Sequence, residues 1–423
     1  MTFAKYTGLI VAGVIAFSAP DGFGQEIAAP GGRLFPPVEI ISRLLDTHPM
    51  VREAGAKLNA AEADARRLRV GDHDFVLEGE YVRRDVSPGP VFNEWNAGVS
   101  RAIRLPGKAS ADRKIGDIGI RAAELARDDA RHQTALLFKD QWIAWTEASA
   151  QLSIDEAEAD TYRKEVDNVQ RRLDLKGASQ LDLEQARAAL AQAESAEIES
   201  RRVLDGAALT LHHSFPDLVL PSKVPSFPQP TGLPGGEAEW RMRVIEHSHE
   251  IALAAAQAQR AMSIAHRASM DRFADPTIGV RAFQERGGEE TGIGVSLSIP
   301  FGLRRRQAIS DTMRADAVAA SVREQSMRRE IALVADKDVS DAVASFNAWK
   351  KAALARKASS DVVSRMRRAV QLGDRDFSEL LLVLRQHFNV ERSEEKQRAA
   401  AHRALFQLEI DAHQIWGLHH EDE

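Results

Sequence analysis

Histidine and carboxylate side chains gather at two places in this sequence where they could bind a metal ion. The segment EHSHE places His247 and His249 two residues apart, on different sides of a helix, which is poor geometry for chelation. The final segment WGLHHEDE could hold a divalent cation weakly through His419, His420, Glu421, Asp422 and Glu423. A polar tail without fixed partners is the favoured interpretation of that segment. We therefore expect no metal site and no cofactor.

Catalytic motifs are also missing from the sequence. It contains no GxSxG nucleophile elbow, no phosphate-binding loop and no HExxH zinc motif, and GIGVSL lacks the third glycine of a dinucleotide-binding fingerprint. Cysteine is absent, which excludes disulfides, thiolate metal sites, cysteine nucleophiles and a lipid-modified cysteine. The sequence predicts a protein that is not an enzyme and has no catalytic residues.

The first residues are typical of a secretory signal peptide. Lys5 precedes the apolar run Leu9 to Phe17, small residues follow, and the run is too short to span a membrane. A buried N-terminal helix is the alternative. We expect residues 1–24 to be a signal peptide, and no later apolar run is long enough to predict a transmembrane helix. The net charge of −6, with both signs interspersed, does not indicate nucleic-acid binding.

The elements that would position a functional site repeat along the chain. Four landmarks recur at an offset of 196 residues: Gly98-Val99-Ser100 with Gly294-Val295-Ser296, Ile103 with Ile299, Arg171-Arg172 with Arg367-Arg368, and Gly177 with Gly373. This spacing predicts a tandem duplication of a domain-sized unit. Six prolines between Pro216 and Pro234 predict an extended linker. We expect a first repeat over 25–215, a Pro-rich linker over 216–236, a second repeat over 237–416 and a polar tail over 417–423.

Each repeat is expected to contain a helix, two strands and two long helices. The helices should cover 38–69 and 237–270; in the first of these, Leu44, Leu45, Val51, Ala54 and Leu58 recur at helical spacing. The strands should be FVLEGEYVRRD and EWNAGVSRAIRL in the first repeat, and TIGVRAFQE and TGIGVSLSIPF in the second. The fold class is therefore mainly α with a small β part.

The length of the later helices indicates how they pack. A helix over about 110–176 would be roughly 100 Å long. Helices of that length are stable only when they lie side by side as coiled coil, so Gly177 and Gly373 should mark the tips of two antiparallel helical hairpins.

The alternation of the strands predicts that they face lipid. Apolar residues fall on one face and small or polar residues on the other. The apolar residues of the second repeat are Ile293, Val295, Leu297, Ile299 and Phe301, and those of the first repeat are Trp95, Val99 and Ile103. In the first repeat Arg101 interrupts the apolar face. A half-buried hairpin of a soluble protein fits any single strand equally well. Export without transmembrane helices favours the lipid-facing interpretation. Four strands cannot close a barrel, so several chains must share one.

In these features the chain resembles the outer-membrane efflux protein (TolC-like) family over about Val38 to Trp416. The resemblance is carried by the duplicated plan, by GVSLSIPFGLRRRQ and by the two tips, LKGASQLDLEQAR and QLGDRDFSELLLVLRQ. It implies a homotrimer with a twelve-stranded barrel in the outer membrane and a long helical tunnel across the periplasm. It also implies a passive exit duct that works with a periplasmic adaptor (membrane fusion) protein and an inner-membrane pump of the resistance–nodulation–division type.

The resemblance also assigns roles to the tips. The periplasmic gate would lie in the second tip, at Asp374, Arg375, Asp376 and Glu379, with Glu379 at the constriction. Leu382 stands where the family carries a further acid, which leaves a single or a double acidic ring open. The adaptor would dock at both tips, through Leu175, Gly177, Ser179, Leu181, Leu372 and Gly373. Solvated hairpin ends with ordinary capping are the alternative for both sets.

Two further alternatives concern function as a whole. A soluble periplasmic coiled-coil protein, such as an adaptor, is the competing class, although an adaptor would carry a β-domain of many short strands and usually one helical hairpin. The compact length and the lack of a lipid-anchor cysteine resemble the heavy-metal cation (CzcC-like) branch of the family. The cargo, a metal cation, a drug or a protein, is not determined by the sequence.

Overall fold

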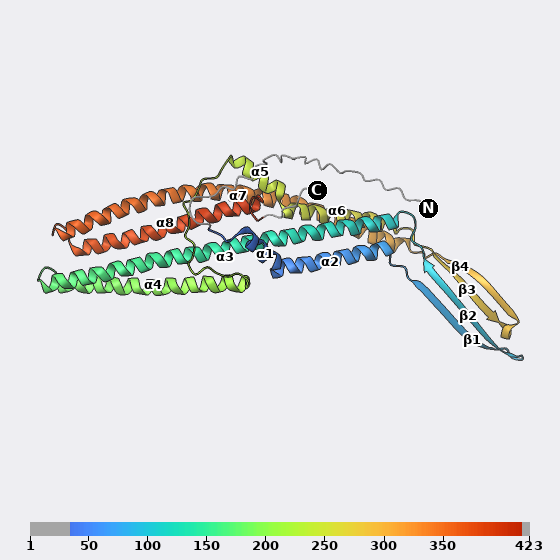
Figure 1. Cartoon of the computed structure of the whole chain (residues 1–423). Coiled ribbons are helices and arrows are strands. Elements are labelled where there is room, and N and C mark those ends of the chain that lie inside the picture. The colour runs from blue at the N-terminus through green and yellow to red at the C-terminus, as the bar shows by residue number, and fades with distance from the viewer. Residues whose placement is uncertain (1–33, 417–423) are drawn as a thin grey trace, which may run out of the picture.

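The computed structural model describes residues 34–416. The expected signal peptide over 1–24 and the polar tail over 417–423 lie outside these residues. No helix among the described residues is both long enough and apolar enough to cross a membrane. The protein is an elongated bundle of helices with one antiparallel four-stranded sheet at one end (Figure 1). The expected fold class, mainly α with a small β part, is confirmed.

The same order of elements occurs twice along the chain. The first series is α1 (Val38–Thr47), α2 (Pro49–Val70), β1 (Phe75–Asp85), β2 (Val91–Ala102), α3 (Lys108–Asp174) and α4 (Gln180–Ser214). The second is α5 (Glu237–His247), α6 (His249–Met270), β3 (Thr277–Glu285), β4 (Glu290–Ser298), α7 (Leu303–Gln371) and α8 (Phe377–Asp411), with the 3-10 turn η1 (Arg286–Gly288) between the strands.

Two expected helices are each broken into two. The helix expected over 38–69 stops at His48, whose backbone is extended because the next residue is Pro49. The helix expected over 237–270 stops at Ser248, which is also extended and whose hydroxyl accepts a hydrogen bond from the Ile251 N–H at 3.1 Å. Ser248 therefore caps α6 and makes the chain change direction without a proline.

Two very long helices determine the shape. α3 and α7 have 67 and 69 residues, and each is roughly 100 Å long. Two shorter helices follow one another along each of them: α2 and α4 pack on α3, and α6 and α8 pack on α7 (Figure 1). Contacts of α3 with α6 and α8 join the two halves. Long helices are thus stabilised by side-to-side packing and not by a deep globular core.

The largest apolar cluster lies midway along the rods. Phe138 and Trp142 of α3 are its centre, with ring centroids 5.7 Å apart, and Phe215 packs edge-on against Phe138 at 5.2 Å. The Trp142 indole N–H donates to the Leu34 carbonyl at 2.8 Å. The Pro-rich segment after α4 also packs on the bundle, where Phe227 stacks on His402 of α8. It therefore crosses the helices as an extended strap.

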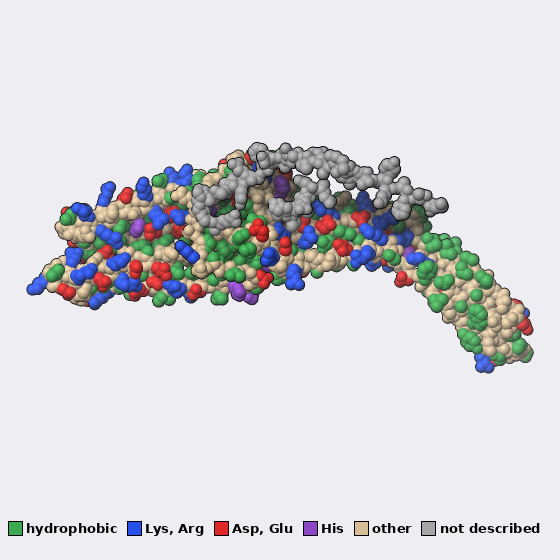
Figure 2. Space-filling model, in the orientation of Figure 1, with side chains coloured by type: hydrophobic (Ala, Val, Ile, Leu, Met, Phe, Trp, Pro, Cys, Tyr) green, Lys and Arg blue, Asp and Glu red, His purple; other side chains and the backbone are tan. Residues whose placement is uncertain are grey.

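The sheet has one apolar face and one face of small and polar residues. Its order is β1-β2-β3-β4, so the central β2–β3 pairing joins the two hairpins and β1 and β4 are edges. One row of paired residues across the sheet is Leu77, Val99, Val280 and Val295; the adjacent row, on the other face, is Glu78, Gly98, Arg281 and Gly294. Figure 2 shows the contrast with the helices, whose surface is dense in charge.

Candidate functional site

The two helical hairpin tips lie next to each other and enclose a groove of about 740 Å³. α3, α7 and α8 line it, and three of the predicted docking residues, Leu175, Leu372 and Gly373, are in the lining. Gly177, Ser179 and Leu181 are not. An apolar cluster that includes Val169, Leu183, Val370 and Phe377 packs the hairpins together beneath the groove.

Basic side chains dominate the charge of this groove. Lys164, Arg171, Arg172 and Arg367 line it, against the single acid Glu165. Arg367 lies 3.5 Å from Glu165, and this pair connects α7 to α3. Two exposed leucines, Leu175 and Leu372, add an apolar surface at the outer end. The groove therefore suits a partner with an apolar tip and acidic flanks.

The two tips have the same backbone geometry, but their glycines are not equivalent. The left-handed residue after the helix is Gly373 in the second tip, with φ 78°, and Lys176 in the first, with φ 60°. The closing hydrogen bonds are Asp374 N–H to Ala369 O and Gly177 N–H to Arg172 O. The tips therefore correspond at an offset of 197 (Gly373 with Lys176, Asp374 with Gly177). Gly177 lies within the first tip, and the left-handed residue there is Lys176, one position before it.

The residues predicted to form the gate surround the second tip. Gly373 and Asp374 close the helix end, Asp376 precedes α8, and Arg375 pairs with Glu379 at 3.3 Å within the same hairpin. Both members of this pair are exposed, and such a pair contributes little to stability. Within one chain, Arg375 is therefore held by Glu379 and not by an acid of a neighbouring helix.

All residues predicted to face lipid are exposed. Val295 and Leu77 are 78% and 84% exposed and belong to the apolar face. Ile103, Ile299 and Phe301 are also exposed but lie beyond the ends of the strands, since β2 ends at Ala102 and β4 at Ser298. Arg101, which interrupts the apolar pattern, lies 4.6 Å from the Phe75 ring and donates to the His73 carbonyl. Its charge is therefore accommodated at the end of the sheet nearest the helices.

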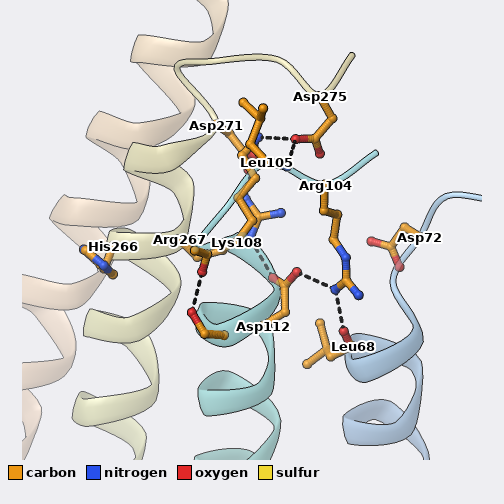
Figure 3. A network of polar contacts seen from close by, with 12 residues as sticks. Leu68, Asp72, Arg104, Leu105, Lys108, Asp112, His266, Arg267, Asp271 and Asp275 are labelled. Carbon is orange, nitrogen blue, oxygen red and sulfur yellow. Dashed lines mark hydrogen bonds and ion pairs between the residues drawn. The ribbon is translucent and has the colours of Figure 1, made fainter. Parts of the chain in front are cut away.

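A network of ion pairs at the junction between helices and sheet was not predicted from the sequence (Figure 3). Arg104, just after β2, donates to Leu68 O, Arg69 O and Val70 O at the end of α2, and to Asp112 at 3.0 Å. Arg104 therefore caps α2, whose last carbonyls have no partners within the helix. Asp112 also accepts from Arg267 of α6 at 2.6 Å, so the network connects the first series to the second.

Lys108 is the most buried cation of this network, with 1% of its surface exposed. Its ammonium lies 2.9 Å from Asp271 and 2.8 Å from Asp275. Asp275 also accepts from the Leu105 N–H at 3.0 Å and contacts His73 at 2.9 Å. Burial alone would raise the pKa of Asp275, but the hydrogen bonds from Lys108, His73 and Leu105 outweigh it and lower the pKa below its usual value. The network therefore fixes the direction of the sheet relative to the rods.

Comparison with solved structures gives the class of protein that has this fold. The chain is similar to the outer membrane protein VceC from Vibrio cholerae (TM-score 0.70, 16% identity, 89% of this chain and 95% of that chain). It is also similar to the CmeC outer membrane channel of Campylobacter jejuni (TM-score 0.70, 12% identity, 91% and 86%) and to the MtrE outer membrane channel of Neisseria gonorrhoeae in its open state (TM-score 0.61, 16% identity, 89% and 88%).

These likenesses establish the fold: long helices and a four-stranded antiparallel sheet arranged as in the TolC-like outer-membrane channels. CmeC and MtrE are described as outer membrane channels, and VceC as an outer membrane protein. No protein-family model and no curated protein matches the sequence.

Proposed function

We propose that the protein is the outer-membrane exit duct of a tripartite efflux system. One observation carries the proposal: the sheet has an exposed apolar face and two unpaired edges, β1 and β4. Open edges are not tolerated in hydrocarbon, so the edge of one chain must pair with the edge of another. Three chains would close twelve strands into a barrel, and α3, α4, α7 and α8 of each would extend it as a helical tunnel. In a soluble adaptor the same apolar face would be exposed to water and would promote aggregation.

The groove between the tips is the proposed docking site for the periplasmic adaptor. Its two exposed leucines and four basic side chains would receive a helical hairpin of the partner. The duct is proposed to be passive, so an inner-membrane pump of the resistance–nodulation–division type would supply the energy for export. The proposed cargo is a metal cation or a small toxic compound, in line with the resemblance to the heavy-metal cation branch.

The proposed gate is the ring that threefold symmetry would make from the second tip. Glu379 would occur three times around the axis, accompanied by Asp374, Arg375 and Asp376. Two unit charges about 9 Å apart in water repel by roughly half a kcal/mol, and more in a narrow, less polar throat. Such a ring attracts cations and disfavours anions. Release of Glu379 from Arg375 would increase this charge.

Oligomeric state and conductance test the proposal together. Native mass spectrometry of the detergent-purified protein is expected to give a trimer, and planar-bilayer recording is expected to give discrete, cation-selective openings. The Glu379→Gln variant should lower the cation selectivity or the block by divalent ions, whereas Glu62→Gln, an exposed acid on α2, should leave both unchanged. A monomer without conductance would contradict the duct. A conducting trimer with unaltered Glu379→Gln behaviour would contradict only the gate.

A further inference from the structure

A group of buried titratable side chains lies where α8 ends beside the start of α6. Asp411 of α8 is its centre: one carboxylate oxygen lies 3.1 Å from His132 Nε2 of α3, and the other accepts from the Gln407 amide at 2.8 Å. The side chains of His132 and Asp411 are 9% and 8% exposed. Lys139 of α3, also buried, donates to the Gln407 carbonyl. This chain of contacts joins a helix of the first series to a helix of the second.

A second carboxyl group faces Asp411 from α7. Asp338 lies within hydrogen-bonding reach of Asp411, yet its buried Oδ2 finds no donor among the described residues. Two buried carboxylates in contact cannot both be ionised, because their repulsion is not screened by water. A proton on Asp338 removes the repulsion between the two carboxyl groups and gives Asp338 the hydrogen bond that it lacks, since its carboxyl O–H then donates to Asp411.

We propose that Asp338 and Asp411 hold one proton between them, and that this proton together with the His132 imidazolium latches α3 to α7 and α8. The latch is closed when Asp338 is protonated, Asp411 is ionised and His132 is charged, so that each of the three helices supplies one member. Loss of the proton leaves two adjacent carboxylates and loosens the contact between α7 and α8, midway along the rods. The proposal does not depend on the proposed exit-duct function.

Other titratable groups surround the latch on the helices packed against it. Ring centroids place His413 4.4 Å from His249, 5.7 Å from His132 and 5.8 Å from His247. Among residues 34–416, no three side chains of the metal-ligating types are arranged to hold a metal ion, so we interpret the group as proton-binding. Further titratable neighbours among the described residues are Asp128, Asp129, Arg131, Lys139 and Asp140 of α3, Glu250 of α6 and Asp341 of α7.

The pKa directions agree with this distribution of protons. Burial and then Asp411 raise the pKa of Asp338 to about 8. Burial alone would lower the pKa of His132 and raise that of Asp411, but the bond between them reverses both shifts. Burial and the neighbouring histidines lower the pKa of His413 to about 3, so this imidazole stays neutral beside the charged His132.

The sign of the pH dependence follows from Asp338. Its pKa in the folded protein is above its unfolded value, so its contribution to stability is lost as the pH rises through about 8. His413 acts in the opposite direction: its pKa is depressed on folding, so its contribution is lost as the pH falls below about 6.5. The test therefore uses pH values above about 6.5, where His413 is neutral in both the folded and the unfolded protein.

The test compares thermal unfolding of the full chain in detergent between about pH 7 and about pH 9. The wild-type midpoint should fall by a few degrees and level off above about pH 8. In Asp338→Asn the amide still donates to Asp411 but cannot ionise, so this fall should be reduced to the part that His132 contributes, since the pKa of His132 is also raised in the folded protein. Asp361→Asn, which removes an exposed carboxylate further along the same helix, should retain the wild-type fall.

Infrared difference spectroscopy gives a second readout that does not depend on unfolding. At neutral pH a protonated-carboxyl band should be present, should lose intensity in Asp338→Asn and should be unchanged in Asp361→Asn. Equal pH dependence of wild type and Asp338→Asn, or a band unaffected by Asp338→Asn, would overturn the proposal.

Discussion

At the scale of single residues, several buried charges have partners that are distant in sequence. Arg392 of α8 pairs with Asp155 at 2.7 Å and also with Glu158, both on α3. Lys108 pairs with Asp271 and Asp275, more than 160 residues away. A buried cation left without its partners is strongly destabilising, so these pairs make the two halves depend on one another.

Replacing Lys108 with methionine tests this dependence. Lys108→Met keeps most of the side-chain volume but removes the buried cation between Asp271 and Asp275, which then keep only Arg267 and His73 as side-chain partners. It should lower the free energy of unfolding by about 3 kcal/mol near neutral pH. The pKa of both aspartates is depressed in the folded protein, since the hydrogen bonds they accept outweigh burial, so their contribution is present above about pH 4 and lost as the pH falls. The penalty should therefore shrink in acid. Denaturant unfolding at several pH values measures it, with Lys114→Met, an exposed position on α3, as the control.

At the scale of elements, helix ends decide where the chain turns. Each long helix ends in a left-handed residue, but only the second has glycine there. Lysine in this conformation carries a steric cost of roughly 1–2 kcal/mol. The first tip offsets part of it with a capping box, in which Ser179 and Asp182 bond to each other's backbone N–H.

Exchanging the two turning residues should change the tips in opposite directions. Lys176→Gly should stabilise the first tip by about 1 kcal/mol because glycine adopts positive φ without strain, and Gly373→Lys should destabilise the second by a similar amount. Amide hydrogen exchange at the N–H groups of Gly177 and Asp374 reports the local opening of each tip. Slower exchange of Asp374 in Gly373→Lys, or faster exchange of Gly177 in Lys176→Gly, would contradict the assignment of Lys176 as the turning residue.

At the scale of the whole molecule, the sheet differs from the rest of the surface. The helices are covered with charge, whereas the sheet presents patches of hydrophobic side chains and few charges (Figure 2). A row of exposed apolar residues crosses all four strands on one face. Within a single chain this face and the edges β1 and β4 are without partners in the described structure. Lipid would cover the apolar face, and strands of further copies of the chain would supply backbone hydrogen bonds to the two edges.

Arginine at neighbouring positions of β4 tests which face meets lipid. Val295→Arg places a charge on the apolar face and should cost about 2–4 kcal/mol if that position lies near the bilayer midplane, so assembled protein in outer-membrane fractions should fall sharply. Ser296→Arg places the same charge on the opposite face and should leave assembly largely intact. Equal loss in both variants would argue against a lipid-facing role for the Val295 face.

The sequence by itself determined the elements, because periodicity and length are local properties. The alternation of β1 and β3 predicted their limits correctly, and two apolar-periodic runs without proline predicted the very long helices. Local signals were weaker where capping decided the outcome: Pro49 and Ser248 broke two expected helices, and the left-handed residue of the first tip is Lys176 and not a glycine. The gate and docking residues came from resemblance and remain predictions.

Only the tertiary structure decided which residues meet. It placed Leu175 beside Leu372, Lys108 between two aspartates, and His132 against Asp411. Side chains separated by more than 150 positions leave no periodic signal, and their pairing depends on the register in which rods about 100 Å long pack against one another. That register is set by contacts summed over the whole bundle, so no single stretch of sequence contains it.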